Sequence, residues 1–285
     1  MLYVSTESPG FKVLILGELE KMKIGLVSYF NARPLDYGLR LRAEQPGSEL
    51  ELVQETPARL YEALMAGKLD AALISSVEVL RNPQKLGYCD SVGVCAREQV
   101  KSILYIRRRG ADGSLNPDQG DFTDRIPERV YTDSGSRTSV ALLQTLLYEG
   151  AGKVVPVIPT PPEDIPDLLN ETSAGLLIGD SAIRFLASPR VDEFHRVDLA
   201  AWWSRKEGLP FVFALWAYPL DKPVTHDVFE ESLARGREGM DEIIAAAPFE
   251  GAREYLTNIL HYRLTDRDRA GLARFKELLR ASELL

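Results

Sequence analysis

Residues 24–27 form a short apolar run that ends directly in the polar turn 28–31, Ser-Tyr-Phe-Asn. Pro34 follows at a position suited to the first turn of a helix, where a missing N–H group does no harm. A buried strand that ends in serine, tyrosine and asparagine is how an open α/β domain presents ligand-binding groups at the carboxyl ends of its strands. For one such turn taken alone, an ordinary strand, loop and helix without a ligand is the alternative.

The first half of the chain alternates predicted strands with predicted helices. Thr56 and Pro57 suit the cap and first turn of a helix that Gly67 closes. Strands separated by helices of this length indicate right-handed βαβ units and a parallel sheet. The expected strands are 24–27, 49–53, 69–74, 91–96 and 101–107, and the expected helices are 34–43, 58–66 and a short one that Ser75 and Ser76 cap.

A second α/β unit follows the polar, turn-rich stretch 108–125, which we expect to be an exposed loop. Its expected strands are 129–132, 154–158, 174–178 and 210–218, its helices are 140–149 and one from Ser181, and the remainder, 222–282, is expected to be helical with caps at Thr225 and Thr265.

Two similar units and a helical tail predict a two-lobed α/β protein. The expected fold is that of type II periplasmic binding proteins, with the ligand cleft between the lobes. Residues 1–107 and 214–285 would form a discontinuous first lobe, and residues 108–213 the second. The chain crossover rests on analogy with that fold, because periodicity cannot show it.

Composition excludes several classes of function. Of the 285 residues 45% are hydrophobic and 27% charged, and the net charge of −8 argues against a general surface for nucleic acid or anionic membranes. No run reaches transmembrane length. The apolar run 12–16 has neither a basic leader nor a cleavage site, so we expect a cytoplasmic protein with a small-molecule partner.

The cysteines and histidines show no spacing typical of metal ligands. We expect Cys89 and Cys95 to be reduced thiols of the core, and no metal or other cofactor. The chain also lacks the glycine-rich motifs of nucleotide sites and the nucleophile elbow of serine hydrolases. The three histidines lie outside every motif of the chain: His195, His226 and His261.

The segment 133–139, Asp-Ser-Gly-Ser-Arg-Thr-Ser, gathers four hydroxyl groups before a predicted helix. Unpaired backbone N–H groups and the helix dipole make such a place suited to a carboxylate or phosphate. Simple N-capping by Ser136 or Thr138 is the alternative, although one cap needs one hydroxyl. Arg137 is either a further anion contact or a surface residue.

Three further polar residues stand at the ends of apolar runs. Ser76 and Ser102 are candidates for lining a pocket, with a helix cap and a strand terminus as their alternatives. Asp180 follows Gly179 at the end of a strand. Capping of the next helix is the default interpretation of Asp180, and an acid or base that lines the cleft is the other.

Four segments occur in the order of a known family: 23–35, 133–139, 177–181 and 198–216. Together they resemble the chorismate dehydratases of the futalosine route to menaquinone, which convert chorismate to 3-[(1-carboxyvinyl)oxy]benzoate without a cofactor. The resemblance implies that Asn31 is the catalytic residue, hydrogen-bonding the reacting region, and that hydroxyls hold a substrate carboxylate and line the pocket. The substrate-binding residues expected on this basis are Ser28, Ser76, Ser102, Ser136, Thr138, Ser139 and Asp180.

Three alternatives remain open at this point. A solute-binding protein shares the lobes but should carry a signal peptide or a lipidation cysteine. The related 1,4-dihydroxy-6-naphthoate synthase shares the fold and is expected to carry a histidine in its site. A regulatory ligand-binding domain would need a DNA-binding segment, and no basic helix-turn-helix pattern is visible.

Overall fold

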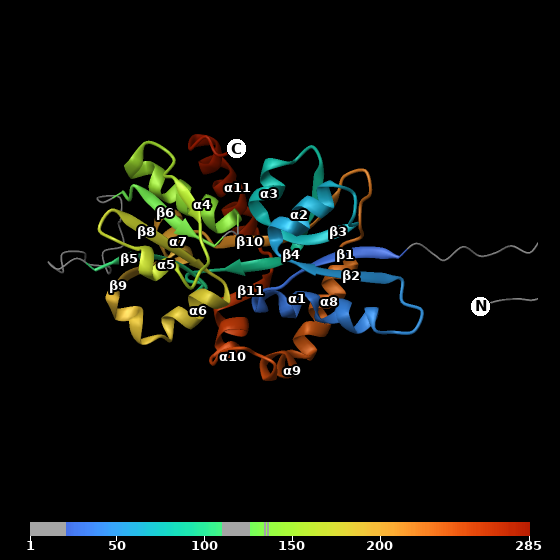
Figure 1. Cartoon of the computed structure of the whole chain (residues 1–285). Helices are drawn as coiled ribbons and strands as arrows, with labels where there is room; N and C mark the ends of the chain where they lie inside the picture. The colour runs from blue at the N-terminus through green and yellow to red at the C-terminus, as the bar shows by residue number, and fades with distance from the viewer. Residues whose placement is uncertain (1–20, 110–125, 134, 136) are drawn as a thin grey trace, which may run out of the picture.

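The computed structural model describes residues 21–109, 126–133, 135 and 137–285. Three features of the sequence interpretation lie outside this part: the apolar run 12–16, nearly all of the loop 108–125, and Ser136. The described chain forms two lobes, each built on its own β-sheet with helices packed around it (Figure 1).

The first lobe contains a six-stranded sheet in the order β11-β4-β10-β3-β1-β2. Strand β1 pairs in parallel with β2 and β3, whereas β10 runs antiparallel to β3 and β4, and β11 antiparallel to β4. The strands are β1 (Met22–Val27), β2 (Leu50–Glu55), β3 (Ala71–Ser75), β4 (Leu86–Ala96), β10 (Phe211–Pro219) and β11 (Leu260–Arg263).

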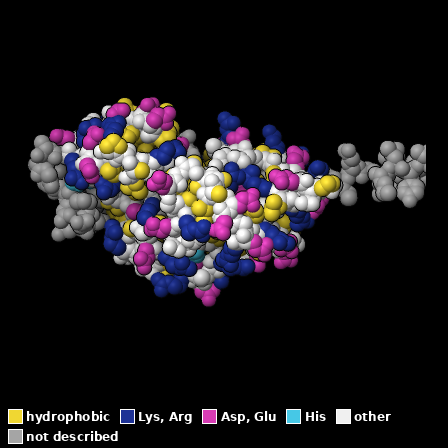
Figure 2. Space-filling view, turned by 90° about the horizontal axis from the view of Figure 1, so that it is seen from below, with side chains coloured by type: hydrophobic (Ala, Val, Ile, Leu, Met, Phe, Trp, Pro, Cys, Tyr) yellow, Lys and Arg dark blue, Asp and Glu magenta, His cyan; other side chains and the backbone are white. Residues whose placement is uncertain are grey.

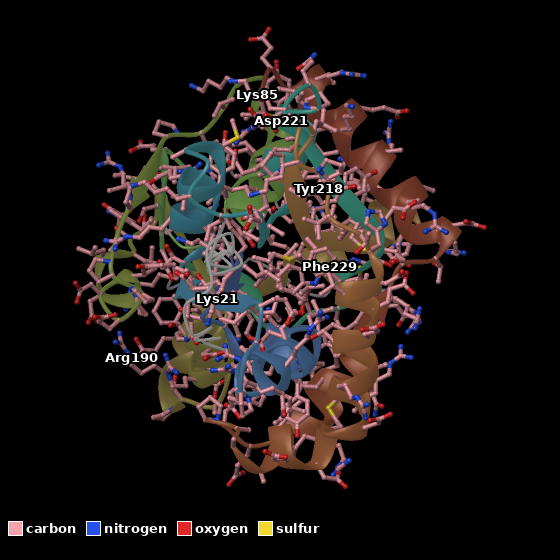
Figure 3. All side chains as sticks on the ribbon, turned by 90° about the vertical axis from the view of Figure 1, so that its right-hand side faces the viewer. Lys21, Lys85, Arg190, Tyr218, Asp221 and Phe229 are labelled. Carbon is pink, nitrogen blue, oxygen red and sulfur yellow. The ribbon has the colours of Figure 1, made fainter. Side chains whose placement is uncertain are left out.

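Helices from both ends of the chain cover this sheet. Helices α1 and α8 pack closely, because a Cβ atom on Gly236 would lie only 2.0 Å from the Pro34 carbonyl oxygen. Phe229 of α8 stacks on Trp216 of β10, with ring centroids 4.6 Å apart, and lies near the strand that carries Tyr218 (Figure 3). The helices of this lobe are α1 (Arg33–Ala43), α2 (Pro57–Met65), α3 (Ser76–Arg81), α8 (Asp227–Glu238), α9 (Met240–Ala245), α10 (Ala252–Glu254), α11 (Asp266–Ala281), a 3₁₀ turn η1 (Phe30–Ala32) and a π-helical turn η5 (Tyr255–Ile259).

The second lobe contains a five-stranded sheet in the order β7-β6-β8-β5-β9. Strand β6 is parallel to β7 and β8, and β5 is antiparallel to β8 and β9. The elements are β5 (Ile103–Arg108), β6 (Arg129–Thr132), α4 (Arg137–Ala151), β7 (Val157–Pro159), α5 (Ile165–Leu168), β8 (Ser173–Ile178), α6 (Asp180–Leu186), η4 (Pro189–Glu193), β9 (Phe194–Asp198) and α7 (Leu199–Glu207).

The chain passes between the two sheets at 97–102 and again at 208–210. We therefore propose lobe boundaries inside these two segments, in place of the expected boundaries at 107/108 and 213/214. The lobes share a core here: Trp203 of α7 packs edge-on against Phe211 of β10 and Phe275 of α11, at centroid distances of 5.1 and 6.1 Å.

Two predictions about the sheets were wrong. Both sheets are mixed rather than parallel, because β10 and β5 each return antiparallel to strands distant in sequence. The tail is not entirely helical, since residues 260–263 add β11 to the edge of β4, and β9 was not expected. Pairing with a distant strand decides these segments, and a short alternation of polar and apolar residues does not reveal it.

Some predictions that depend only on residues close together in the sequence are confirmed. Thr265 caps α11 in a full capping box with Asp268, as expected. The other cap expected in the tail, Thr225, is wrong, because His226 occupies the N-cap position of α8. Cys89 and Cys95 are buried free thiols, which confirms their assignment to the core. None of the helices in the described ranges is long and apolar enough to cross a bilayer. The face seen in Figure 2 carries positive and negative side chains interspersed.

Candidate active site

A small, partly open cavity of about 40 Å³ lies between the two sheets. The ends of β1, β3 and β8 open onto it, which is where α/β domains place ligands. Apolar side chains such as Val27, Ile103, Ile178 and Phe213 form much of the wall. The polar side chains that line it are Tyr29, Asn31, Ser75, Ser102 and Ser139.

The turn after β1 separates this cavity from a neighbouring surface groove of about 360 Å³. Tyr29 and Asn31 line the cavity, whereas Ser28 and Phe30 line the groove. Ser28 is exposed, and its hydroxyl donates to the Glu55 carbonyl at 3.4 Å. The structure therefore places the predicted residue Asn31 at the cavity and the predicted residue Ser28 outside it.

Asn31 is held by two tyrosines of the tail. The Tyr262 hydroxyl donates to the Asn31 main-chain carbonyl at 3.0 Å. The Asn31 side chain lies beside the Tyr255 hydroxyl, where it acts against the rise that burial causes in the Tyr255 pKa. Neither tyrosine belongs to a sequence motif, and nothing in the local pattern around 255–262 marked them. Their position follows only from the return of the tail to the first lobe.

The adjacent pair Ser75 and Ser76 divides between two environments. Ser75 lines the cavity, whereas Ser76 is fully buried and donates to the Val212 carbonyl at 2.7 Å. Sequence reasoning chose Ser76 and passed over Ser75. Ser76 thus lies at the junction of the lobes, where its hydroxyl is 3.4 Å from that of Thr138.

The amino terminus of α4 shows a similar division. The Thr138 hydroxyl accepts the Val77 N–H at 3.2 Å across the junction, and Ser139 faces the cavity. Arg137 forms ion pairs with Glu62 at 3.1 Å and Glu78 at 3.4 Å, so it links the lobes and does not line the cavity.

The crossover 97–102 brings Ser102 to the cavity in a constrained backbone. Lys101 has a φ of 58°, a conformation that a non-glycine residue adopts only when its surroundings hold it there. Asp198 does so by accepting the N–H groups of Val100 and Lys101 at 2.9 and 2.6 Å. The other oxygen of Asp198 caps α7 through Ala200 and Ala201.

Burial raises the pKa of the Asp198 carboxyl, and its four backbone N–H bonds act against that shift. A carboxylate so occupied is a structural anchor rather than a reacting group. Ser102 itself is tied to the second lobe, because the Gly179 N–H donates to its carbonyl at 2.7 Å.

Asp180 is the first residue of α6, and Gly179, with a φ of 66°, occupies the N-cap position. The expected capping role is therefore wrong. The carboxylate lines the neighbouring groove together with Phe30. Burial raises the pKa of the Asp180 carboxyl. The charge of Arg184, the Phe30 N–H group and the charge of Arg33 act against this rise.

Asp133 is also bound locally, since its carboxylate accepts the Gly135 N–H at 3.0 Å. Burial raises the pKa of Asp133; the Gly135 N–H opposes this, and the charge of Glu163 adds to it. Asp133 does not line the cavity.

Tyr29 connects the lobes, although the sequence pattern gave it no role of its own. Its ring lies against Gly179 and its hydroxyl against Gly135, both in the second lobe. Burial raises the pKa of the Tyr29 phenol, and the charges of Asp133 and Asp180 add to this. The phenol therefore stays neutral and serves as a hydrogen-bond donor at the cavity.

Among the described residues that line the cavity there is no Asp, Glu, His, Lys or Arg. Neutral hydroxyls and one amide from both lobes surround a small apolar space. Such a site can orient and hydrogen-bond an anionic ligand, but its side chains offer no strong base.

A separate cluster joins Cys95, His261 and Asp268 on three elements. His261 Nε2 lies 2.8 Å from Asp268 Oδ1, and Asp268 completes the capping box of α11. These contacts account for the cluster as part of the fold.

The sequence of the chain matches known proteins over almost its whole length. A family model described as menaquinone biosynthesis matches residues 22–281. The chorismate dehydratase of Thermus thermophilus is 30% identical over 279 residues, which cover 90% of this chain and 94% of that protein. The chorismate dehydratase of Campylobacter jejuni is 23% identical, with 92% and 100% covered.

Solved structures confirm the two-lobed fold. A protein from Archaeoglobus fulgidus superposes with a TM-score of 0.70 at 18% identity, over 93% of this chain and 99% of that one. The periplasmic aliphatic sulphonate binding protein of Escherichia coli superposes with a TM-score of 0.60 at 14% identity, over 93% and 88%. The expected periplasmic-binding-protein-like fold is therefore confirmed.

Proposed function

The chain belongs to the menaquinone biosynthesis family, and we propose that it is a chorismate dehydratase, a hydro-lyase acting in the cytoplasm. The observation that carries this proposal is a match along nearly the whole chain to proteins of that name. The cavity between the lobes, lined by neutral donors from both sheets, supports it.

The reaction needs positioning more than it needs a reactive side chain. The ring C–H bond beside the enolpyruvyl ether breaks, and its electron pair forms the new double bond of the ring. The neighbouring C–O bond breaks, and the departing hydroxyl leaves with the proton as water. Formation of the aromatic ring supplies the driving force, so the balance of atoms and electrons calls for no co-reactant.

Asn31 is placed to hydrogen-bond the departing hydroxyl from the first lobe. Ser139 and the backbone N–H groups at the start of α4 suit a substrate carboxylate, because the helix dipole favours negative charge there. Ser75 and Ser102 line the remaining wall. Ser136 stays a predicted carboxylate contact outside the described residues.

The proton acceptor in this proposal is a carboxylate of the substrate itself. The described residues that line the cavity include no carboxylate and no histidine, and Asp133 and Asp180 both point elsewhere. A substrate held in one conformer gains the large effective concentration of an intramolecular base, so orientation by Asn31 and Ser102 suffices.

The lobes must part for the substrate to enter. The cavity of about 40 Å³ has room for a few water molecules and not for a six-membered ring with two carboxylates. We infer that the described form is closed and that opening occurs at the crossovers 97–102 and 208–210.

The residues that line the cavity give less support to the alternative functions. A 1,4-dihydroxy-6-naphthoate synthase is expected to carry a histidine in its site, but all three histidines of the chain are described and none lines the cavity. A small-anion solute-binding protein would bind chorismate or a similar anion without chemical change, and this is what the experiment separates.

The test is to incubate purified protein with chorismate, without added metal or cofactor, and to follow products by chromatography with mass detection. We expect loss of one water above the uncatalysed rate, and strong impairment in Asn31→Ala. Binding without turnover would favour a binding protein, and absence of binding would overturn the proposed activity.

A further inference from the structure

The segment 249–262 of the tail encloses the turn that carries Asn31. Phe249 packs edge-on against Phe30 at a centroid distance of 5.4 Å, and Tyr255 packs against Phe249 at 5.7 Å. Tyr262 donates to the Asn31 carbonyl at 3.0 Å. The tail therefore fixes the backbone and the surroundings of this turn.

The same segment also contacts the crossover that leads to the second lobe. Lys101 Nζ lies 3.0 Å from Glu254 Oε1, one residue before Tyr255. Burial raises the pKa of the Tyr255 phenol, and the side chains of Ser102 and Asn31 beside its hydroxyl act against that shift. Tyr255 is only 4% exposed and does not line the cavity, so its hydroxyl serves these two partners rather than a ligand.

Asn31 and Ser102 reach the cavity from different parts of the fold. Asn31 follows β1 of the first lobe, and Ser102 ends the crossover and precedes β5 of the second. One phenol oxygen in contact with both side chains sets the distance between them. It also restricts the Asn31 amide, whose terminal torsion is otherwise broad, and the freely rotating Ser102 hydroxyl.

The local backbone is unusual at the same place. Tyr255 begins the π-helical turn η5, a rare conformation that often occurs at functional sites, and Lys101 beside Ser102 has a positive φ. One feature begins at Tyr255 and the other precedes Ser102 directly.

We propose that Tyr255 is a positioning residue, which holds Asn31 and Ser102 in the geometry needed for turnover as the lobes close. This inference deepens the proposed dehydratase activity and rests on it. Tyr255 acts through its two partners and does not touch the substrate.

The test is Tyr255→Phe, which keeps the buried ring and removes only the hydroxyl. We expect kcat to fall by about 10- to 100-fold with KM changed by less than about 3-fold, because misplacement of groups acts on the transition state. Tyr105→Phe is the matched control, since Tyr105 is equally buried, lies on β5 and does not line the cavity. Its kcat should stay within about 2-fold of the original protein, as expected for a change remote from the reacting groups.

A double-mutant cycle with Ser102→Ala separates positioning from loss of stability. If Tyr255 acts through Ser102, the combined loss in kcat is smaller than the product of the single losses by at least about 3-fold. Assays are run well below each unfolding midpoint, with folding checked by circular dichroism. Equal kcat values for Tyr255→Phe and Tyr105→Phe, or strictly multiplicative losses, would overturn the proposal. If the unmodified protein fails to convert chorismate, the proposed function fails instead.

Discussion

The hydroxyl of Tyr29 fills the space beside Gly135, so that a Cβ atom at residue 135 would lie 1.9 Å from the Tyr29 oxygen. Tyr29 belongs to the first lobe and Gly135 to the second. The ring of Tyr29 also approaches Gly179, where a Cβ atom would lie 3.1 Å from Cδ1. In this arrangement of the lobes Tyr29 leaves little room for a side chain at residue 135 or 179.

Gly135→Ala should therefore impair closure more than folding. Overpacking of this kind costs about 1–3 kcal/mol, so we expect kcat/KM for chorismate to fall by about 10-fold or more. Tyr29→Phe provides the matched background, because without the hydroxyl the nearest ring atom is Cζ at 3.2 Å. In that background the alanine should cost less than about 3-fold, since most of the overlap is gone. Equal losses in both backgrounds would contradict a direct contact between residues 29 and 135.

The neighbours Ser75 and Ser76 should respond to alanine in opposite ways. Ser76→Ala leaves the buried Val212 carbonyl without its 2.7 Å donor, so we expect a loss of about 1–3 kcal/mol in the free energy of unfolding. Its kcat should change little. Ser75→Ala should leave the unfolding free energy nearly unchanged and weaken turnover or binding. Chemical denaturation and steady-state kinetics on both variants decide this, and the reverse pattern would show that Ser76 is the ligand contact.

Asp180→Asn should keep most of its turnover. Loss of a general base typically costs about 100- to 10,000-fold, whereas the Asp180 carboxylate faces the groove and the Phe30 N–H. We expect kcat within about 3-fold of the original protein, because in the proposed reaction a carboxylate of the substrate takes the proton. A collapse of kcat in a folded variant would make Asp180 the base.

The stability of Asp180→Asn should depend on pH in a definite direction. Burial raises the folded-state pKa of Asp180 above 3.8, so its favourable contribution is present below pH 3.8 and is lost as pH rises through the folded pKa. The asparagine variant should then unfold at a higher temperature than the original protein at neutral pH. This advantage should vanish at pH values below 3.8, which thermal unfolding across a pH series would show.

Asp268 should show the opposite pH dependence. Burial acts to raise its pKa, but hydrogen bonds from His261 and Thr265 outweigh burial and lower it below 3.8. Its stabilising contribution is therefore present above pH 3.8 and is lost as pH falls below that value. Asp268→Asn should destabilise the protein by about 0.5–2 kcal/mol at neutral pH through the broken capping box.

The matched control is Asp266→Asn, in the same first turn of α11 with a fully exposed side chain. Its unfolding midpoint should follow that of the original protein at every pH. If both variants lose the same stability at neutral pH, the helix dipole rather than the buried His261–Asp268 contact would explain the effect.

The sequence by itself determined the elements whose causes are local. The apolar run before 28–31, the first-turn Pro34 and the Thr265 cap act over a few residues, and each appears in the structure as expected. The ordered family-like segments also predicted the two-lobed fold and pointed to Asn31. Asn31 lines the cavity because it follows the carboxyl end of β1, at the edge of the sheet. The sequence did not predict the mixed strand directions or the strands β9 and β11, because the strands that pair there are distant in sequence.

Only the tertiary structure decided which polar groups face the cavity. Ser75 and Ser76 have the same chemistry and adjacent positions. Ser76 donates its hydroxyl to the Val212 carbonyl, 136 residues away, whereas Ser75 lines the cavity. Tyr255 comes to Asn31 and Ser102 only because the tail returns to the first lobe. The direction of a side chain at the end of a strand is set by contacts across the fold, whereas periodicity reports only the few residues on either side.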